Sequence, residues 1–185
     1  GGAVDFSMSG IHVKGVESNS HNNSSGIQIG TNGTPNTGQI VIEECKFSNF
    51  TKNSITVKGG NAAITGNLID CKPYPGAAGN GIQIDMGAVA VITGNTINGY
   101  VSYADSWSAC GVLVLRDGKI NRIRDNTLSD CGTGITKETY YDTDDHQTYL
   151  DPEAARNNTF VNCGQNVDFE FDLMEEIAAN SGGVV

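Results

Sequence analysis

The chain has 185 residues, a formal net charge of −10, and 24 glycines against only 4 prolines. This length fits one domain. The acidic balance argues against a nucleic-acid partner, because nucleic-acid binding needs clustered Lys and Arg. No run of about 18 apolar residues occurs, so membrane insertion is not expected. The repeating pattern begins close behind Gly1. We therefore expect a mature or excised piece of a longer protein.

Two short phrases recur along the chain. The first consists of an apolar residue, two small or polar residues, a turn residue, any residue and a second apolar residue. Its copies occupy residues 6–11, 42–47, 64–69, 92–97, 123–128 and 155–160. The second phrase, Gly-Ile-x-Ile in its clearest form, occupies residues 26–29, 54–57, 81–84, 111–114, 134–137 and 166–169. Fixed phrases joined by spacers of variable length indicate a repeat architecture.

The spacing of the first phrase indicates the kind of repeat. Its turn residues lie between 22 and 36 residues apart, and the apolar residues alternate with the period of a strand. Three short strands fit into the shortest repeat. The pattern resembles the right-handed parallel β-helix of the pectate-lyase-like superfamily over about residues 4–171. The resemblance implies an all-β fold of about six coils over residues 1–171, with residues 172–185 as a C-terminal cap or tail.

The resemblance also assigns the phrases to three sheets. Gly-Ile-x-Ile corresponds to the first sheet, Ile-x-Gly-Asn to the second, and the hydrophobe after the Asn to the third. The apolar residues of each phrase should stack in the interior as aliphatic columns. Asn67, Asn95, Asn126 and Asn158 should form a ladder at a tight bend, where Asn tolerates a left-handed φ. Ser9 and Cys45 stand in the place of Asn in two copies, so the ladder should be interrupted there.

Five cysteines leave the redox state open. Cys131 and Cys163 each lie five residues beyond a turn Asn, so they should stack in adjacent coils. Either buried thiols that act as small hydrophobes or a Cys131–Cys163 disulfide fits this placement. Zinc is not favoured, because the sequence has no C-x-x-C pair.

Spacers of several lengths connect the predicted strands. The loops expected on either side of the first sheet are residues 99–110, with Tyr100, Tyr103 and Trp107, and residues 138–153, with Tyr140 and Tyr141. Nothing before the first phrase covers the strand edges of the first coil. A second copy of the chain or an adjoining domain is therefore expected at this uncapped N-terminal end.

The outer face of the first sheet is the predicted ligand groove. Amide and carboxylate groups point outward there, between loops that carry aromatic rings. Aromatic rings stack on the apolar faces of sugars, while polar groups bind the hydroxyls. The residues predicted to bind ligand are Gln28, Gln83, Tyr103, Trp107, Tyr140 and Tyr141. The leading hypothesis is an extracellular or cell-surface module, of bacterial or phage origin, that binds polysaccharide.

A polysaccharide lyase or glycoside hydrolase is the first alternative. Asp85 and Glu138 should lie two coils apart in one column, about 9.5 Å between Cα atoms. This is near the upper end of the carboxylate separation of inverting glycosidases. Lys58, one coil from Asp85, could abstract a proton in a lyase. Solvated carboxylates and a Lys58–Asp85 surface ion pair are the simpler interpretation. The arginine-centred and paired-Asp signatures of pectate lyases and polygalacturonases are missing.

Two further interpretations stay open. The chain could be a structural spacer of a large adhesin or phage tail protein, with no ligand of its own. Calcium is the one cofactor considered. Asp142, Asp144 and Glu153 fall at positions 1, 3 and 12 of an EF-hand-like loop. Gln147 replaces the Gly of that loop, so an ordinary solvated acidic loop is the alternative.

Overall fold

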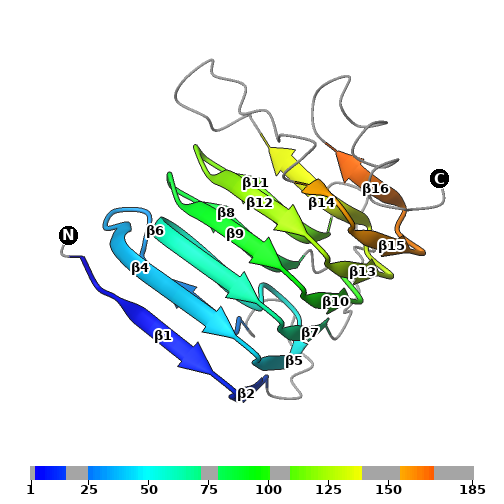
Figure 1. Cartoon of the computed structure of the whole chain (residues 1–185), viewed down its shortest axis with the longest axis horizontal. Helices are drawn as coiled ribbons and strands as arrows, with labels where there is room; N and C mark the ends of the chain where they lie inside the picture. The colour runs from blue at the N-terminus through cyan, green and yellow to red at the C-terminus, as the bar shows by residue number, and fades with distance from the viewer. Residues whose placement is uncertain (1–2, 16–24, 72–78, 101–108, 139–154, 169–185) are drawn as a thin grey trace.

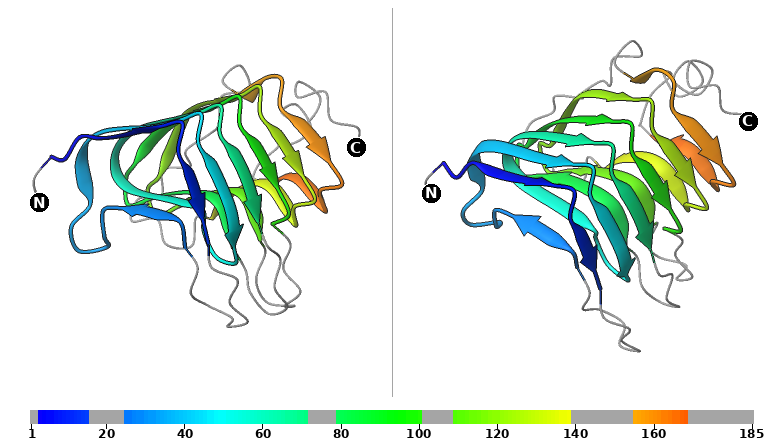
Figure 2. Two further views of the ribbon diagram at one scale, coloured as in Figure 1. Left: turned by 90° about the horizontal axis from the view of Figure 1, so that it is seen from below. Right: turned by 60° about the horizontal axis from the view of Figure 1, so that its bottom comes forward.

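The chain winds through three parallel sheets in turn, and successive turns of the winding stack on one another (Figure 1). The computed structural model describes residues 3–15, 25–71, 79–100, 109–138 and 155–168. Every strand pairing within these residues is parallel. Figure 2 shows the strands of each turn lying beside those of the next. The described residues contain no helix long and apolar enough to cross a membrane.

The strands divide among the sheets as the sequence predicts. The first sheet contains β3 (Ile27–Ile29), the first part of β6 (Ile55–Thr65), β8 (Asn80–Asp85), β11 (Cys110–Leu115), β14 (Thr133–Glu138) and β16 (Gln165–Asp168). The second sheet contains β1 (Phe6–Ser9), β4 (Asn36–Glu43), the second part of β6, β9 (Val89–Thr93) and β12 (Lys119–Arg124). The third sheet contains β2 (His12–Lys14), β5 (Lys46–Phe50), β7 (Leu68–Cys71), β10 (Thr96–Asn98), β13 (Thr127–Ser129) and β15 (Thr159–Val161).

Strand β6 takes part in two sheets because two glycines bend it. Gly59 and Gly60 have φ values of +77° and +78°, a region that Gly adopts without steric cost. Residues before this bend pair with β3 and β8 in the first sheet. Residues after it pair with β4 and β9 in the second sheet.

Columns of aliphatic side chains fill the space between the sheets, as the sequence predicts. Ile55 lies opposite Ile82 in the first sheet, and Ile64 lies opposite Ile92 in the second. All four side chains are fully buried. Alternation along each strand sends every second side chain inward, and the parallel register places like residues over one another. Burying one such side chain contributes about 1.5–3 kcal/mol relative to leaving it exposed.

The asparagine ladder is confirmed. The backbone N–H of Asn67 donates to Oδ1 of Asn95 at 3.0 Å, and that of Asn95 donates to Oδ1 of Asn126 at 2.9 Å. Each side-chain Nδ2 also donates to a carbonyl of the preceding coil, as from Asn95 to Ile64 O at 2.9 Å. The ladder ends at Cys45, whose N–H donates to Asn67 while its thiol donates within its own coil to Glu43 O at 3.1 Å.

The prediction that the ladder Asn itself takes the left-handed backbone is wrong. The residue before it does so instead: Gly66 and Gly94 have φ +66°, and Asp125 has φ +57°. Gly, Asp and Asn visit this region at least cost. The preceding residue therefore makes the bend, while the side chain of Asn95 turns inward to bond the neighbouring coils.

The first copy of the phrase is shifted by two residues from its predicted alignment. Ser9 pairs with Glu43, not with Cys45. Ile11 occupies the ladder position, since its carbonyl accepts a bond from Lys46 N at 2.9 Å. A shift of two preserves the inward and outward alternation, so the hydrophobic pattern does not reveal it.

The first-coil strands have one open edge each within the described residues. β1 pairs with β4, β2 with β5 and β3 with β6, and none of the three has a second partner there. Val4 and Ile11 are exposed at this end of the molecule. The contact with a second chain or an adjoining domain stays a prediction.

Tyr100 belongs to the core and not to a surface loop, contrary to the sequence interpretation. Its side chain is fully buried, and its hydroxyl bonds Ser54 Oγ at 2.6 Å. Burial raises the pKa of Tyr100 well above its ordinary value. This ring lies at the bend between the third and first sheets. Asn53 and Asn80 form a second ladder at the same bend, where Asn80 N donates to Asn53 Oδ1 at 3.1 Å.

Candidate ligand-binding site

The strand register of the first sheet places residues in the two predicted columns. The first column is Gln28, Thr56, Gln83, Leu113, Thr136 and Asp168. In the second column Lys58 lies opposite Asp85 and Leu115 lies opposite Glu138. The predicted register is therefore confirmed. The roles of these residues in binding or catalysis stay predictions.

A buried chain of polar groups crosses this face. Asn53 Nδ2 donates to Gln83 Oε1 at 2.6 Å, and Gln83 Nε2 donates to Asp85 Oδ2 at 3.0 Å. Arg116 completes the chain by donating from Nε to Asp85 Oδ1 at 2.7 Å and from its terminal nitrogen to Oδ2. The backbone N–H of Met86 also donates to Oδ1 at 2.8 Å. Each carboxylate oxygen thus accepts two hydrogen bonds, although Asp85 has no exposed surface.

The expected Lys58–Asp85 ion pair is replaced by an Arg116–Asp85 pair. Lys58 instead donates to Asn32 Oδ1 at 2.6 Å. Arg116 reaches Asp85 because it stands in the tight turn after β11, where Arg116 and Asp117 both have a left-handed φ. The planar guanidinium matches both carboxylate oxygens at once, which an ammonium does not. The expectation of a solvated Asp85 carboxylate is wrong for the same reason.

The other predicted site residues are placed only in part. Gln28 is exposed and donates to Gly30 O at 3.1 Å. Glu138 ends β14, two coils from Asp85, with Leu115 in the strand between them. The residues that lie outside the described part of the chain are Tyr103, Trp107, Tyr140, Tyr141, Asp142, Asp144 and Glu153.

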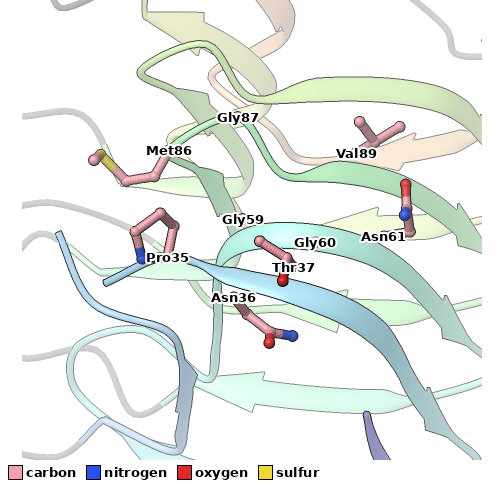
Figure 3. Close-up of a pocket in the computed structure, with 9 residues that line it drawn as sticks. All are labelled: Pro35, Asn36, Thr37, Gly59, Gly60, Asn61, Met86, Gly87 and Val89. Carbon is pink, nitrogen blue, oxygen red and sulfur yellow. The ribbon is translucent and has the colours of Figure 1, made fainter. Parts of the chain in front are cut away.

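A groove of about 350 Å³ lies at the corner between the first and second sheets (Figure 3). Three successive coils contribute to it. Its lining is Pro35, Asn36, Thr37, Gly59, Gly60, Asn61, Met86, Gly87 and Val89. The volume falls within the roughly 300–1,000 Å³ of small-molecule sites. The groove is open to solvent and adjoins the polar chain, since Met86 directly follows Asp85.

Apolar and polar groups share the lining of the corner groove. Figure 3 shows Pro35 and Met86 near one end, and Thr37, Asn61 and Val89 towards the other. Thr37 and Asn61 are exposed. Asn36 is already engaged, because its amide exchanges two hydrogen bonds with the backbone of Val4, at 3.1 and 3.0 Å. Thr37 and Asn61 are therefore the side chains best placed to bond a ligand.

The described residues contain no group of three His, Cys, Asp or Glu side chains close enough to hold a metal ion. The predicted calcium loop lies outside them. Calcium binding by Asp142, Asp144 and Glu153 stays a prediction.

Comparison with family models matches the description "right handed beta helix region" over residues 5–171. The chain belongs to the right-handed β-helix family. Comparisons with curated proteins and with solved structures found no match. The β-helix thus presents two adjoining surfaces: the outer face of its first sheet, with the buried Gln83–Asp85–Arg116 chain, and the corner groove between the first and second sheets.

Proposed function

We propose that this β-helix is a polysaccharide-binding module that works outside the cell or at a cell surface. The corner groove carries the proposal. It offers the apolar surfaces of Pro35, Met86 and Val89 beside the polar groups of Thr37 and Asn61. A sugar ring has apolar C–H faces and a rim of hydroxyls, so it matches this mixture of apolar contact and hydrogen bonding.

The groove is an open surface running across several coils, which suits a chain more than a small enclosed ligand. None of its lining residues carries a charge. Neutral sugar units are therefore the expected occupants, in keeping with a protein whose net charge of −10 disfavours anionic polymers. An array of neutral and uronic polysaccharides tests this directly. Binding confined to uronic polymers would contradict the assignment of the groove.

The double substitution Thr37→Ala and Asn61→Ala should weaken binding of an array hit about tenfold. Each lost hydrogen bond contributes about 0.5–1.5 kcal/mol, and 1.4 kcal/mol in total is about a factor of ten in Kd. Isothermal titration calorimetry measures the change. Asn121→Ala, at an exposed position of β12 in the second sheet, is the matched control. Equal affinity of the double variant and the control would remove the groove from the binding site.

Trp107→Ala tests the sequence-based part of the proposal. A ring stacked on a sugar removes apolar area from water that contributes about 1–2 kcal/mol. The substitution should therefore weaken the affinity for the array hit about tenfold in the same titration and leave the melting temperature unchanged. A lower melting temperature with unchanged affinity would identify Trp107 as a packing residue, and the first-sheet loops would then not be part of the site.

Cleavage of the polysaccharide by Asp85, Glu138 and Lys58 is a weaker proposal. All acceptor sites of the Asp85 carboxylate are taken by Gln83, Met86 and Arg116. A glycosidase carboxylate must instead reach the substrate or a water molecule. Product analysis on the array hit separates the two functions. Turnover that disappears in Glu138→Gln and Lys58→Gln, with binding retained, would favour the enzyme.

A further inference from the structure

Cys131 and Cys163 occupy equivalent places in two neighbouring turns of the β-helix. Thr133 lies opposite Gln165 in the parallel pairing of β14 and β16, so the residues two positions earlier are also in register. The backbone agrees, since Gly164 N donates to Cys131 O at 3.0 Å. The two Cα atoms are therefore about one strand spacing, 4.8 Å, apart.

The two side chains also turn the same way. Each sulfur approaches the carbonyl oxygen two residues earlier: Cys131 Sγ lies 3.3 Å from Ser129 O, and Cys163 Sγ lies 3.9 Å from Val161 O. Both residues are free thiols, and each thiol shifts the pKa of the other. A disulfide needs Cα atoms roughly 4.4–6.8 Å apart with the Cβ vectors not diverging. The strand register meets the first condition, and the shared direction of the two thiols is in keeping with the second.

We propose that Cys131 and Cys163 are a redox-active dithiol that is oxidised by a low-molecular-weight disulfide to an intramolecular disulfide. In the first step the Cys163 thiolate attacks one sulfur of the small disulfide. A Cys163 mixed disulfide forms and one small thiolate leaves. In the second step Cys131 attacks the Cys163 sulfur, the Cys131–Cys163 bond forms, and the second small thiolate leaves. The two protein thiols give up two electrons and two protons, and the small disulfide becomes two thiols.

The surroundings assign the first step to Cys163. Cys163 is partly exposed, whereas Cys131 is only 2% exposed. The hydrogen bond from Cys131 lowers the pKa of Cys163 from 9.0 to about 7, against the opposing effects of partial burial and of the Asp130 carboxylate. The same pairing, together with burial and the nearby Cys110 thiol, raises the pKa of Cys131. Since the thiolate is the nucleophile, Cys163 reacts first and Cys131 resolves the mixed disulfide.

Cys71 serves as the internal comparison. It lies opposite Phe50 in the third sheet and not opposite another cysteine. Its thiol approaches Phe50 O at 3.2 Å. Burial and the Asp70 carboxylate raise the pKa of Cys71 to about 12. It should therefore stay reduced under conditions that oxidise the pair.

The experiment incubates the reduced chain with glutathione disulfide at pH 7.5. The number of free thiols titrated in denaturant should then fall from five to three. Tryptic mapping without reductant should join residues 125–137 to residues 157–185. The oxidised chain should also melt roughly 5–10 °C higher, because the bond closes a loop in the unfolded chain. The Cys71→Ser variant should still form the bond, and Cys163→Ser should not.

Alkylation by iodoacetamide supplies a second readout. Reactivity of Cys163 should rise with pH around a midpoint near 7, because the thiolate fraction increases through its pKa. In Cys131→Ala, which removes the side-chain donor, the midpoint should move towards 9, the ordinary thiol value. Retention of all five free thiols, a mixed disulfide that persists on Cys163, or a cross-link between Cys110 and Cys131 would each overturn the proposal.

Discussion

Replacing Arg116 by methionine is expected to lower the free energy of unfolding by about 3 kcal/mol. Asp85 has no exposed surface, and Arg116 holds both of its carboxylate oxygens. Removing one partner of a buried pair leaves an uncompensated charge, which costs about 3–5 kcal/mol. Arg116 is 28% exposed, so the lower end of this range applies. Methionine keeps the apolar stem, and urea denaturation measures the loss.

A double-mutant cycle isolates the ion pair from the other contacts of Arg116. The double variant Asp85→Asn and Arg116→Met should be more stable than the sum of the two single effects predicts, by about 1 kcal/mol or more. Arg122→Met, at an exposed position of β12, is the matched control and should change stability by less than about 0.5 kcal/mol. Simple additivity of the two single effects would contradict a direct Asp85–Arg116 interaction.

Replacing Asn95 by alanine should cost about 1–3 kcal/mol. Asn95 Oδ1 accepts from both the backbone N–H and the Nδ2 of Asn67, and its own Nδ2 donates to Ile64 O. Alanine leaves these buried groups without partners, and an unsatisfied buried donor or acceptor costs about that amount. Thermal and urea unfolding measure the loss.

The ladder as a whole provides the check on this prediction. Asn67→Ala and Asn126→Ala should behave like Asn95→Ala, because each of these residues bonds both neighbouring coils. The exposed Asn121→Ala is the control for loss of an amide as such. If all three ladder variants unfold like Asn121→Ala, the ladder does not stabilise the β-helix.

The sheets and the interior columns were predictable because they depend on local alternation. A phrase such as Gly-Ile-x-Ile predicts which side chains point inward. Its repetition in parallel strands predicts which residues stack on one another. Ile55 over Ile82 and Ile64 over Ile92 follow from that rule alone. The same rule correctly placed Gln83 and Asp85 on the outer face of the first sheet.

The errors arise where alternation carries no information. A shift of two residues keeps the pattern intact, so alternation alone aligns Ser9 with the ladder in place of Ile11. Tyr100 stands after a glycine at the end of a repeat, where composition suggests a loop, yet it is buried against Ser54. In both cases the backbone path through a bend decides where the side chain lies. That path depends on contacts with neighbouring coils, which the sequence pattern does not contain.

The candidate site was predictable only in its outline. The Arg116–Asp85 pair depends on a left-handed turn that brings Arg116 next to Asp85 of β8. The spacing of residues in the sequence does not predict this turn. The corner groove joins residues 35–37, 59–61 and 86–89 from three coils. These are mostly turn residues that carry no chemical motif, so only the three-dimensional stacking brings them together.

The most direct test of polysaccharide binding at the corner groove is a chemical-shift titration of ¹⁵N-labelled protein with an oligosaccharide from the array. The shifts should concentrate on the backbone amides of the lining, with Thr37, Gly59, Asn61, Gly87 and Val89 affected most. The dependence of these shifts on ligand concentration should give the same Kd as calorimetry. Shifts confined to the third sheet, or none at any ligand concentration, would contradict the proposed function.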